Sequence, residues 1–336
     1  MKIRSRAPVR ISFAGGGTDI TPFMEDYGGA VLNATINLYA WTTLETDNIR
    51  GIEIVSDNYS KKIFAPNKEE LGKDGELQLI KTIIHNMNHI DGNFNVYLRS
   101  EVPPGSGLGG SGAAFASVIG AFNHLLNEKR MSLYDIAEMS YSLERNDMGI
   151  PGGCQDQYAT VFGGINFLEL KSPNNVKINP LRLPKSTIYE LEKRLVLVNV
   201  GDRKNSFNIL LDQVKAYDTK DQIETLKKTK EMAYIMKYQL LKGDIDAFGT
   251  SLDKAWQEKK KFSKHITNPR IDELYNLALQ TGAIGGKITG AGGGGHMLFL
   301  CKENIEHKVA EALQSMDCKI IPFSFDFDGL QTWEVK

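Results

Sequence analysis

The chain has 336 residues, of which 41% are hydrophobic and 24% are charged, and its 40 basic and 41 acidic side chains give a net charge of −1. This is the composition of an ordinary globular protein, and the length favours two domains, each large enough to bury a core. A nucleic-acid-binding protein would usually carry a basic excess, and a membrane-spanning one an apolar run of about 20 residues. The sequence shows neither, so we expect no nucleic-acid partner and no membrane partner.

The N-terminus and the cysteines indicate the compartment. The first 19 residues are basic but lack the apolar segment of a signal peptide. The three cysteines, Cys154, Cys301 and Cys318, form no C-x-x-C pair, and their odd number argues against a disulfide framework. We therefore expect reduced thiols in a cytoplasmic protein; composition specifies no oligomeric state.

The elements of the first half follow from hydrophobic periodicity and from helix and strand stops. Pro103 and Pro104 end one strand, and Ser132 should cap a helix with Asp135 in its first turn. The expected strands are 2–13, 30–46, 93–101, 161–170 and 194–200, and the expected helices are 76–90, 111–127 and 133–145.

From about residue 205 the pattern becomes helical, and then it alternates. Helices are expected at 205–217, 220–241, 245–262, 270–281 and 303–315, and strands at 284–289, 296–301, 318–323 and 329–335. Asn268 and Pro269 mark one helix start. This order suits an α+β fold with a mixed or antiparallel sheet, which we divide into domains 1–195 and 196–336.

A glycine-rich loop with the sequence PPGSGLGGSGA spans residues 103–113, between a predicted strand and a predicted helix. A helix N-terminus offers free N–H groups and partial positive charge, and glycine lets the backbone approach an anion, so the segment predicts a phosphate site. A flexible turn is the alternative. Gly105, Gly107 and Gly110 fit the pattern G-x-G-x-x-G, but a Rossmann loop would follow its strand directly, and a protein-kinase loop joins two strands whereas this one opens a helix. Walker A is excluded because Gly286 and Lys287 are followed by Ile288. The predicted ATP-binding residues are Pro104, Gly105, Ser106, Gly107, Leu108, Gly109, Gly110, Ser111 and Gly112.

The chain resembles the GHMP kinases, named for galactokinase, homoserine kinase, mevalonate kinase and phosphomevalonate kinase. Three ordered motifs carry the resemblance: APVRISFAGGGTD at 7–19, the loop at 103–113, and KITGAGGGG at 287–295. They are similar to the Pro-x-Arg…Thr-Asp opening, the Pro-x-x-x-Gly-Leu-x-Ser-Ser-Ala loop and the Lys-x-Thr-Gly-Ala-Gly-x-Gly-Gly segment of that family. The resemblance implies an N-terminal ribosomal protein S5 domain 2-like domain, a C-terminal ferredoxin-like domain, and ATP and Mg²⁺ as cofactors.

Within the family, the chain looks most like the kinases of heptose phosphates. The GGGTD form of the first motif, the run GGCQDQY at 152–158 and the stretch 268–270 carry this likeness. It implies phosphorylation of D-glycero-D-manno-heptose 7-phosphate at the anomeric hydroxyl, on the GDP-heptose route, with a small-molecule sugar phosphate as partner. Another sugar or polyol kinase of the family, for galactose, fucose or mevalonate, remains an alternative. So do a catalytically silent sensor of ATP and sugar and, more remotely, a Rossmann oxidoreductase.

Asp156 is the candidate catalytic base, because its segment resembles the catalytic aspartate segment of galactokinase. Phosphoryl transfer needs a group that orients the acceptor hydroxyl and takes its proton. Arg10 is the expected partner, since a positive charge favours the ionised carboxylate and stabilises charge on the transferred group. The alternatives are a loop-capping aspartate and a surface arginine.

The resemblance assigns further roles residue by residue. Ser111 and Glu144 are expected to hold Mg²⁺, which prefers oxygen ligands, although Glu144 could be a solvated helix residue. The predicted substrate-binding residues are Gly16, Gly17, Thr18, Asp19, Gly153, Arg203 and Gly292. Retention of the candidate base, its arginine and both metal ligands favours an enzyme over a sensor.

The chain departs from the family pattern at two places. Gly110 stands where the family usually has its first serine, which removes a hydroxyl near the phosphates. Gly16 and Gly17 stand where galactokinases carry Glu-His, and glycine there should open space for a longer sugar with a phosphate on its tail. Arg203 and Lys204 are the candidates to meet that phosphate, and exposed loop charges are the alternative.

Two other clusters have simpler interpretations. His85 and His89 share a helix face but lack the glutamate of a zinc protease motif, so a polar helix surface is expected. The lysines at 259–261 are expected to form a solvated helix face, with contact to a sugar phosphate as the lesser alternative.

Overall fold

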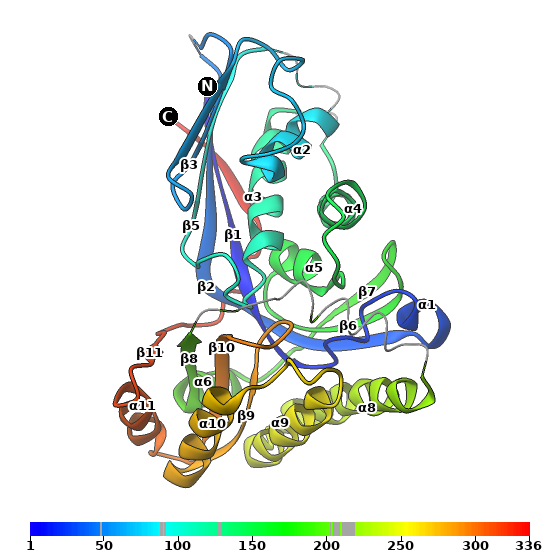
Figure 1. The fold of residues 1–336 in the computed structure, drawn as a ribbon, viewed down its shortest axis with the longest axis vertical. Coiled ribbons are helices and arrows are strands. Elements are labelled where there is room, and N and C mark those ends of the chain that lie inside the picture. Colours follow the sequence, from blue (N-terminus) through cyan, green and yellow to red (C-terminus); the bar gives the residue numbers. More distant parts are fainter. Residues whose placement is uncertain are drawn as a thin grey trace.

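The computed structural model describes residues 1–47, 49–87, 90, 92–126, 130–201, 203, 209 and 219–336. Two sheets organise these residues (Figure 1). The first sheet has eight strands, in the order β12-β1-β2-β5-β3-β4, with β6 and β7 added beyond β2. Its strands are β1 (Lys2–Ala14), β2 (Gly29–Glu45), β3 (Ile52–Ser56), β4 (Lys61–Ala65), β5 (Phe94–Ser100), β6 (Ile165–Ser172), β7 (Asn175–Pro180) and β12 (Gln331–Val335).

Helices cover one face of the first sheet (Figure 1). They are α2 (Gln78–Asn86), α3 (Gly110–Leu125), α4 (Leu133–Ser142) and α5 (Gln155–Phe162), while the short α1 (Phe23–Tyr27) precedes β2. Helix α3 is almost completely buried and packs on β1 and β2. Its small residues permit this close approach: a Cβ on Gly120 would lie 2.8 Å from the side chain of Leu330.

The second sheet has four antiparallel strands in the order β11-β8-β10-β9. Numbered within this part of the chain, the order is 4-1-3-2, and the hairpin β9–β10 lies between two helical connections, as in a ferredoxin-like arrangement. The strands are β8 (Leu195–Gly201), β9 (Ala283–Ile288), β10 (Gly295–Cys301) and β11 (Lys319–Ile320). The helices are α6 (Lys185–Arg194), α8 (Lys220–Lys242), α9 (Ile245–Lys260), α10 (Pro269–Thr281) and α11 (Glu306–Gln314).

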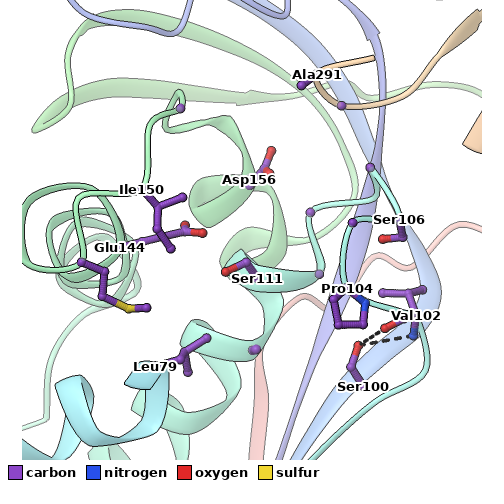
Figure 2. A pocket seen from close by; sticks show the side chains of 18 of the residues that line it. Leu79, Ser100, Val102, Pro104, Ser106, Ser111, Glu144, Ile150, Asp156 and Ala291 are labelled. Carbon is purple, nitrogen blue, oxygen red and sulfur yellow. Dashed lines mark hydrogen bonds between the residues drawn. The ribbon is translucent and has the colours of Figure 1, made fainter. Parts of the chain in front are cut away.

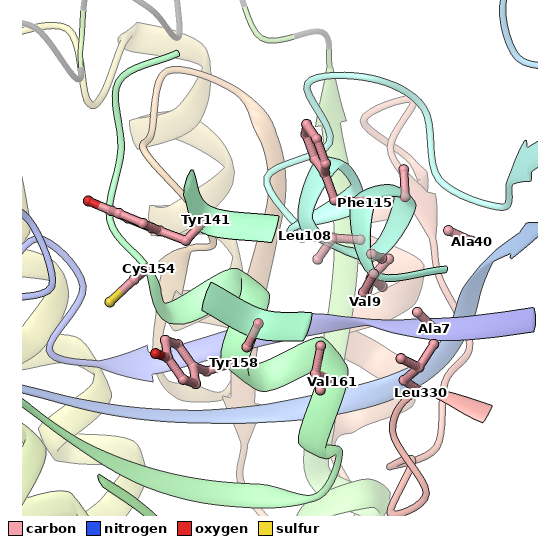
Figure 3. Close-up of a cluster of buried hydrophobic side chains, with 14 of the residues drawn as sticks. Ala7, Val9, Ala40, Leu108, Phe115, Tyr141, Cys154, Tyr158, Val161 and Leu330 are labelled. Atoms are coloured by element: carbon pink, nitrogen blue, oxygen red, sulfur yellow. The ribbon is translucent and has the colours of Figure 1, made fainter. Parts of the chain in front are cut away.

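Each sheet has its own hydrophobic core. One cluster lies between the first sheet and its helices and extends to α8 and α9, and the other surrounds the second sheet. Figure 3 shows part of the first, whose members include Val9 of β1, Phe115 of α3 and Tyr158 of α5. The predicted α+β class is confirmed by this arrangement.

The helix caps follow the sequence signals. Ser132 caps α4 and forms a reciprocal capping box with Asp135, and Asn268 caps α10 ahead of Pro269. None of the described helices is long and apolar enough to cross a membrane.

Several predicted elements differ from the structure. The segment expected as a strand at 161–170 ends α5 and begins β6 only at Ile165, and a π-helical segment (Leu143–Asp147) follows α4. Strands β3, β4 and β7 and helix α6 were not predicted. The last strand, β12, belongs to the predicted second domain by sequence but pairs with β1 in the first sheet. The helix expected at 205–217 lies outside the described residues, as do His89 and Lys204.

Candidate active site

A cavity of about 700 Å³ lies where the helix-covered face of the first sheet meets the second sheet. Residues of the three glycine-rich motifs line it together with the segment 148–156 (Figure 2). Most of the predicted site residues are therefore brought together. Those that line the cavity are Arg10, Gly16, Gly17, Asp19, Pro104, Gly105, Ser106, Gly107, Gly109, Gly110, Ser111, Glu144, Gly153, Asp156 and Arg203.

Arg10 and Asp156 form an ion pair beside the glycine loop. Arg10 is buried in β1, and its Nε and Nη2 both lie 2.7 Å from Asp156 Oδ1. Its Nη1 donates to the carbonyl oxygen of Gly107, at 2.7 Å. Asp156 Oδ2 accepts no hydrogen bond from any residue that the structure describes. One carboxylate oxygen is thus fixed, while the other is available to a ligand.

The glycines of the loop allow the N-terminus of α3 to approach this pair. Gly109 caps the helix with φ 75°, and a Cβ there would lie 3.2 Å from Arg10 Cγ and 3.4 Å from Asp156 Oδ2. A Cβ on Gly112 would lie 3.1 Å from that of Asp156. The free N–H groups of the first helical turn therefore lie beside the carboxylate, and together with the loop they would suit an anion.

The third motif joins the glycine loop to the second sheet. His296 of β10 lies with Nδ1 2.8 Å from the carbonyl oxygen of Ser106, and burial, as the largest cause, lowers the pKa of this imidazole. Gly290 lies against Gly107, where a Cβ would be 2.8 Å from the Gly107 Cα. Lys287, buried in β9, donates to the carbonyl oxygen of Ser12 at 2.7 Å, and its burial shifts its pKa well below the ordinary value. These contacts hold the glycine loop between both halves of the molecule.

Ser111 and Glu144 face the same part of the cavity (Figure 2). Ser111 is the second residue of α3 and is exposed. Glu144 is buried in the π-helical segment, accepts a hydrogen bond from Gln157 and lies 3.4 Å from Arg145 Nη2. No cluster of three or more His, Cys, Asp or Glu side chains with metal-binding geometry occurs among the described residues. The two oxygen donors would suit a cation that takes its remaining ligands from phosphate and water.

Thr18 and Asp19 differ in their access to the cavity. Thr18 is fully buried, and its hydroxyl donates to the backbone oxygens of Gly15 and Ala30, so it does not line the cavity as a sugar-binding residue would. Asp19 lines it but already accepts hydrogen bonds from Gly17 N–H and from Gln155 N–H and Nε2. Asp19 therefore holds Gln155, whose Oε1 is buried and has no partner among the described residues.

The two glycines of the first motif have different surroundings. A Cβ on Gly16 would lie 3.5 Å from Gln155 Nε2 and 3.7 Å from Ser12 Oγ, both of which line the cavity. Gly17 has φ 100°, and a Cβ there would lie 3.0 Å from Phe262. The expectation that a missing side chain opens space therefore fits Gly16, whereas Gly17 faces packed aromatic carbon and meets a backbone requirement.

Three other predicted residues do not line the cavity. Leu108 is buried, and its carbonyl oxygen accepts from Arg10 N–H. Gly112 packs on Asp156, and a Cβ on Gly292 would lie 3.0 Å from Ile266. Gly153 does line the cavity, and a side chain there would overlap the carboxylate of Asp19. Leu108, Gly112 and Gly292 therefore support the site through packing.

Two cations approach the glycine loop from the second half of the chain. Arg203 donates from Nη2 to Thr289 O at 3.3 Å, and burial, followed by the charge of Arg10, lowers its pKa to about 10. Lys259, in the last turn of α9, is buried, lines the cavity and donates to Gly290 O. Burial first, and then Arg203 and Arg10, lower its pKa to about 7. The prediction of a solvated lysine face is therefore wrong at this position: Lys261 is exposed, but Lys259 points inward.

The remaining part of the cavity wall, the far half of the cavity, was not predicted from the sequence. It is lined by the turn between β3 and β4, the start of α2, the end of β5 and the segment 148–151. Its residues include Asn58, Tyr59, Leu77, Leu79, Ser100, Val102, Met148 and Ile150. These residues belong to no glycine-rich motif, and only the tertiary fold brings them together.

The chain matches two family models: the GHMP kinases N terminal domain over residues 78–164, and the GHMP kinases C terminal over residues 236–317. A protein of Campylobacter jejuni named D-glycero-alpha-D-manno-heptose 7-phosphate kinase is 36% identical over 337 residues, which cover 99% of each chain.

Two solved structures also resemble the chain, and they confirm the predicted GHMP kinase fold. A structure described as a D-glycero-D-manno-heptose 1-phosphate kinase from Bacteroides thetaiotaomicron has a TM-score of 0.84 and 32% identity, and covers 99% of both chains. Lactococcus lactis galactokinase complexed with galactose has a TM-score of 0.74 at 20% identity, over 99% of this chain and 95% of that one. This second likeness shows the fold alone.

Proposed function

This chain belongs to the GHMP kinase family, and from that premise we propose that it phosphorylates the anomeric hydroxyl of D-glycero-D-manno-heptose 7-phosphate. The family relationship makes it an ATP-dependent carbohydrate kinase. The identity of the sugar, the reacting hydroxyl and the residue roles are the proposal. The product would be the 1,7-bisphosphate, and with free thiols at its three cysteines the enzyme is expected to act in the cytoplasm.

The name of the 36% identical relative supports the choice of sugar, and the observation that supports phosphoryl transfer is the carboxylate of Asp156, of which Arg10 holds one oxygen. Arg10 holds Oδ1 with two donors, and a Cβ on Gly109, at the start of α3, would lie 3.4 Å from Oδ2. An acceptor hydroxyl bonded to Oδ2 would therefore lie beside the anion-binding N-terminus of α3. Such a position would bring the acceptor hydroxyl next to the phosphates of the donor, which is the main requirement of phosphoryl transfer.

The proposed step uses the chain's own residues in defined ways. The acceptor O–H proton passes to Asp156 Oδ2 while the acceptor oxygen bonds to the terminal phosphorus of ATP, and the bond from that phosphorus to the bridging oxygen breaks to release ADP. An anomeric hydroxyl is more acidic than an ordinary alcohol, so a carboxylate can serve as base. The N–H groups of α3 and the guanidinium of Arg10 stabilise the negative charge on the transferred group.

We assign the nucleotide to the glycine loop and the far half of the cavity. The triphosphate would follow residues 104–111, and the nucleoside would extend between the β3–β4 turn and the start of α2, where Leu79 and Ile150 supply apolar surface (Figure 2). Ser111 and Glu144 would hold Mg²⁺, which neutralises phosphate charge.

The sugar would occupy the opposite side, between Gly16 and Asp156. Buried polar atoms without partners among the described residues, Ser12 Oγ and Gln155 Oε1, lie on that side and could bond sugar hydroxyls. A site built to pair with hydroxyls strongly rejects ligands that lack them, because its own polar groups would stay buried and unpaired.

The names of the two relatives place the substrate phosphate at different ends of the heptose, and the experiment should decide between them. ADP release would be measured with heptose 7-phosphate, heptose 1-phosphate, free heptose, galactose and fucose. Either heptose phosphate could give the 1,7-bisphosphate, so the substrate's kcat/KM is the deciding quantity. We expect the 7-phosphate to be preferred by at least tenfold; equal values for galactose would refute the assignment of the sugar, and a preference for the 1-phosphate would refute the assignment of the hydroxyl.

A further inference from the structure

Lys259 and Arg203 are cations within the cavity wall that have no acidic partner in the described part of the chain. Lys259 is 7% exposed and donates a hydrogen bond to the backbone oxygen of Gly290. Arg203 bonds Thr289 O through Nη2, and its Nε is buried without a partner. Neither forms an ion pair with a carboxylate of the described residues, in contrast to Arg10, which pairs with Asp156.

Both cations meet at Gly290. Lys259 donates to Gly290 O, and a Cβ on Gly290 would lie 2.8 Å from Arg203 Nη2. A Cβ on Gly107 would in turn lie 2.5 Å from the same nitrogen. Lys259, Arg203 and the phosphate loop therefore form one contiguous wall, on which Arg10 adds a third positive charge through its bond to Gly107 O.

This wall is electrostatically unfavourable when no anion is present. A buried charge is costly unless it is paired, and the three positive groups also repel one another. The depressed pKa values of Lys259, to about 7, and of Arg203, to about 10, reflect this burial and repulsion. Asp19 and Asp156 are the acidic groups whose charge acts on Lys259, and each is already held by other donors.

We propose that Lys259 and Arg203 form a phosphoryl-binding site at the junction of the two sheets, with Lys259 as a direct ligand of the phosphoryl group. This inference rests on the proposed phosphotransferase function and deepens it. A doubly charged phosphate monoester has enough oxygens to bond both side chains at once, and a guanidinium fork and an ammonium suit it. The phosphoryl group could be the one already on the sugar or the one in transfer from ATP, because the wall borders both the phosphate loop and the acceptor side.

The two sources predict different kinetics for Lys259→Gln. If the site binds the sugar's own phosphate, KM for heptose 7-phosphate should rise by roughly 10- to 150-fold, the range for one charge-assisted hydrogen bond, while KM for free heptose stays unchanged. If the site binds the group in transfer, kcat should fall by a similar factor with both acceptors, and KM should change little. Lys259→Arg should restore part of the loss in either case.

Lys254→Gln is the matched control, because Lys254 lies on the same helix but is exposed. This control should keep wild-type kinetics. Values for Lys259→Gln within twofold of wild type, for both kcat and KM with every acceptor, would overturn the proposal. Circular dichroism and melting temperature would verify that the variants are folded, and Arg203→Gln gives a second, independent variant of the same site.

A binding measurement separates this inference from the proposed function. Inorganic phosphate and a non-hydrolysable ATP analogue would be titrated calorimetrically into the wild type, Lys259→Gln and Lys254→Gln without any sugar. Weaker phosphate binding in Lys259→Gln alone would support the site even if heptose 7-phosphate proves not to be the substrate. Equal phosphate affinity in all three proteins, together with wild-type kinetics, would exclude the site while leaving the kinase assignment intact.

Discussion

Arg10 holds Asp156 by one oxygen only: its Nε and Nη2 both lie 2.7 Å from Oδ1, although the two residues are 146 positions apart. The third guanidinium nitrogen donates to Gly107 O, so the same side chain fixes the candidate base and the glycine loop. Any movement of the loop is thereby linked to the position of the carboxylate. We therefore expect the pair to act in both binding and chemistry.

Asp156→Asn should reduce kcat by about 100-fold or more, because an amide cannot take up the acceptor proton. The shape of the side chain and the bond from Arg10 to its oxygen can be kept, so ATP affinity should stay within a few-fold of wild type. Steady-state kinetics and a titration with a fluorescent ATP analogue measure the two effects. Near-normal turnover in the folded variant would remove Asp156 from the mechanism.

Gly109→Val should abolish ATP binding without unfolding the protein. The residue has φ 75°, and the new Cβ would press on Arg10 Cγ at 3.2 Å, at the point where α3 presents its free N–H groups. Gly72→Val is the control, since Gly72 has φ 67° but a Cβ placed there would meet no atom within 4 Å. Calorimetry with ATP should show loss of affinity only in Gly109→Val, and unchanged affinity there would mean that the loop does not cradle the phosphates.

Ser111→Ala and Glu144→Gln should each weaken Mg²⁺-dependent ATP use, because the first removes an oxygen ligand of a hard cation and the second replaces a charged carboxylate with a neutral amide. Higher Mg²⁺ should partly restore their rates. Glu144 also accepts from Gln157 and lies near Arg145, so its variant should in addition lower the melting temperature, while that of Ser111 should not. Mg²⁺ titrations of both variants that overlay the wild type would contradict the assignment.

The sequence predicted those parts of the site that depend on local backbone chemistry. The glycine loop, the Ser132 and Asn268 caps and the segment of Asp156 each carry short-range signals, and the structure has the loop and both helix starts where expected. The inward position of Lys259 also had a signal. The buried residues of α9 include Phe248, Leu252 and Ala255, and Lys259 continues that helical spacing, so it should have been assigned to the buried face.

Other features depend on contacts between distant segments and left no local pattern. Thr18 sits in a motif that suggests ligand contact, yet its hydroxyl is used by the backbone of Gly15 and Ala30. The far half of the cavity is assembled from a hairpin, a helix start and a loop whose residues carry no motif. β12 pairs with β1 across almost the whole chain length, which periodicity cannot reveal.

The pH dependence of kcat/KM should reveal the protonation state of Lys259. Its pKa of about 7 lies below the ordinary lysine value because of burial and the charges of Arg203 and Arg10, while Asp19 and Asp156 act in the opposite direction; the buried Lys287 also interacts with it. Below pH 7 the ammonium is charged and can bind a phosphoryl group, and above pH 7 it becomes neutral in the free enzyme. We therefore expect kcat/KM for the phosphorylated sugar to fall as pH rises from about 7 to 9.

Lys259→Arg isolates this effect, because a guanidinium keeps its charge throughout the range. The phosphate monoester itself titrates with a pKa near 6, but it does so equally for both proteins, so only the difference between their profiles is used.

Protonation of Lys259 also affects the stability of the fold. Between pH 7 and about 10 the unfolded chain holds the Lys259 proton and the folded chain does not, so this residue makes the free energy of unfolding rise with pH. Lys259→Met should remove that rise in the free energy of unfolding and stabilise the protein at neutral pH, while lowering its activity. In the kinetic comparison, superimposable pH profiles for wild type and Lys259→Arg would show that Lys259 does not titrate in the working enzyme.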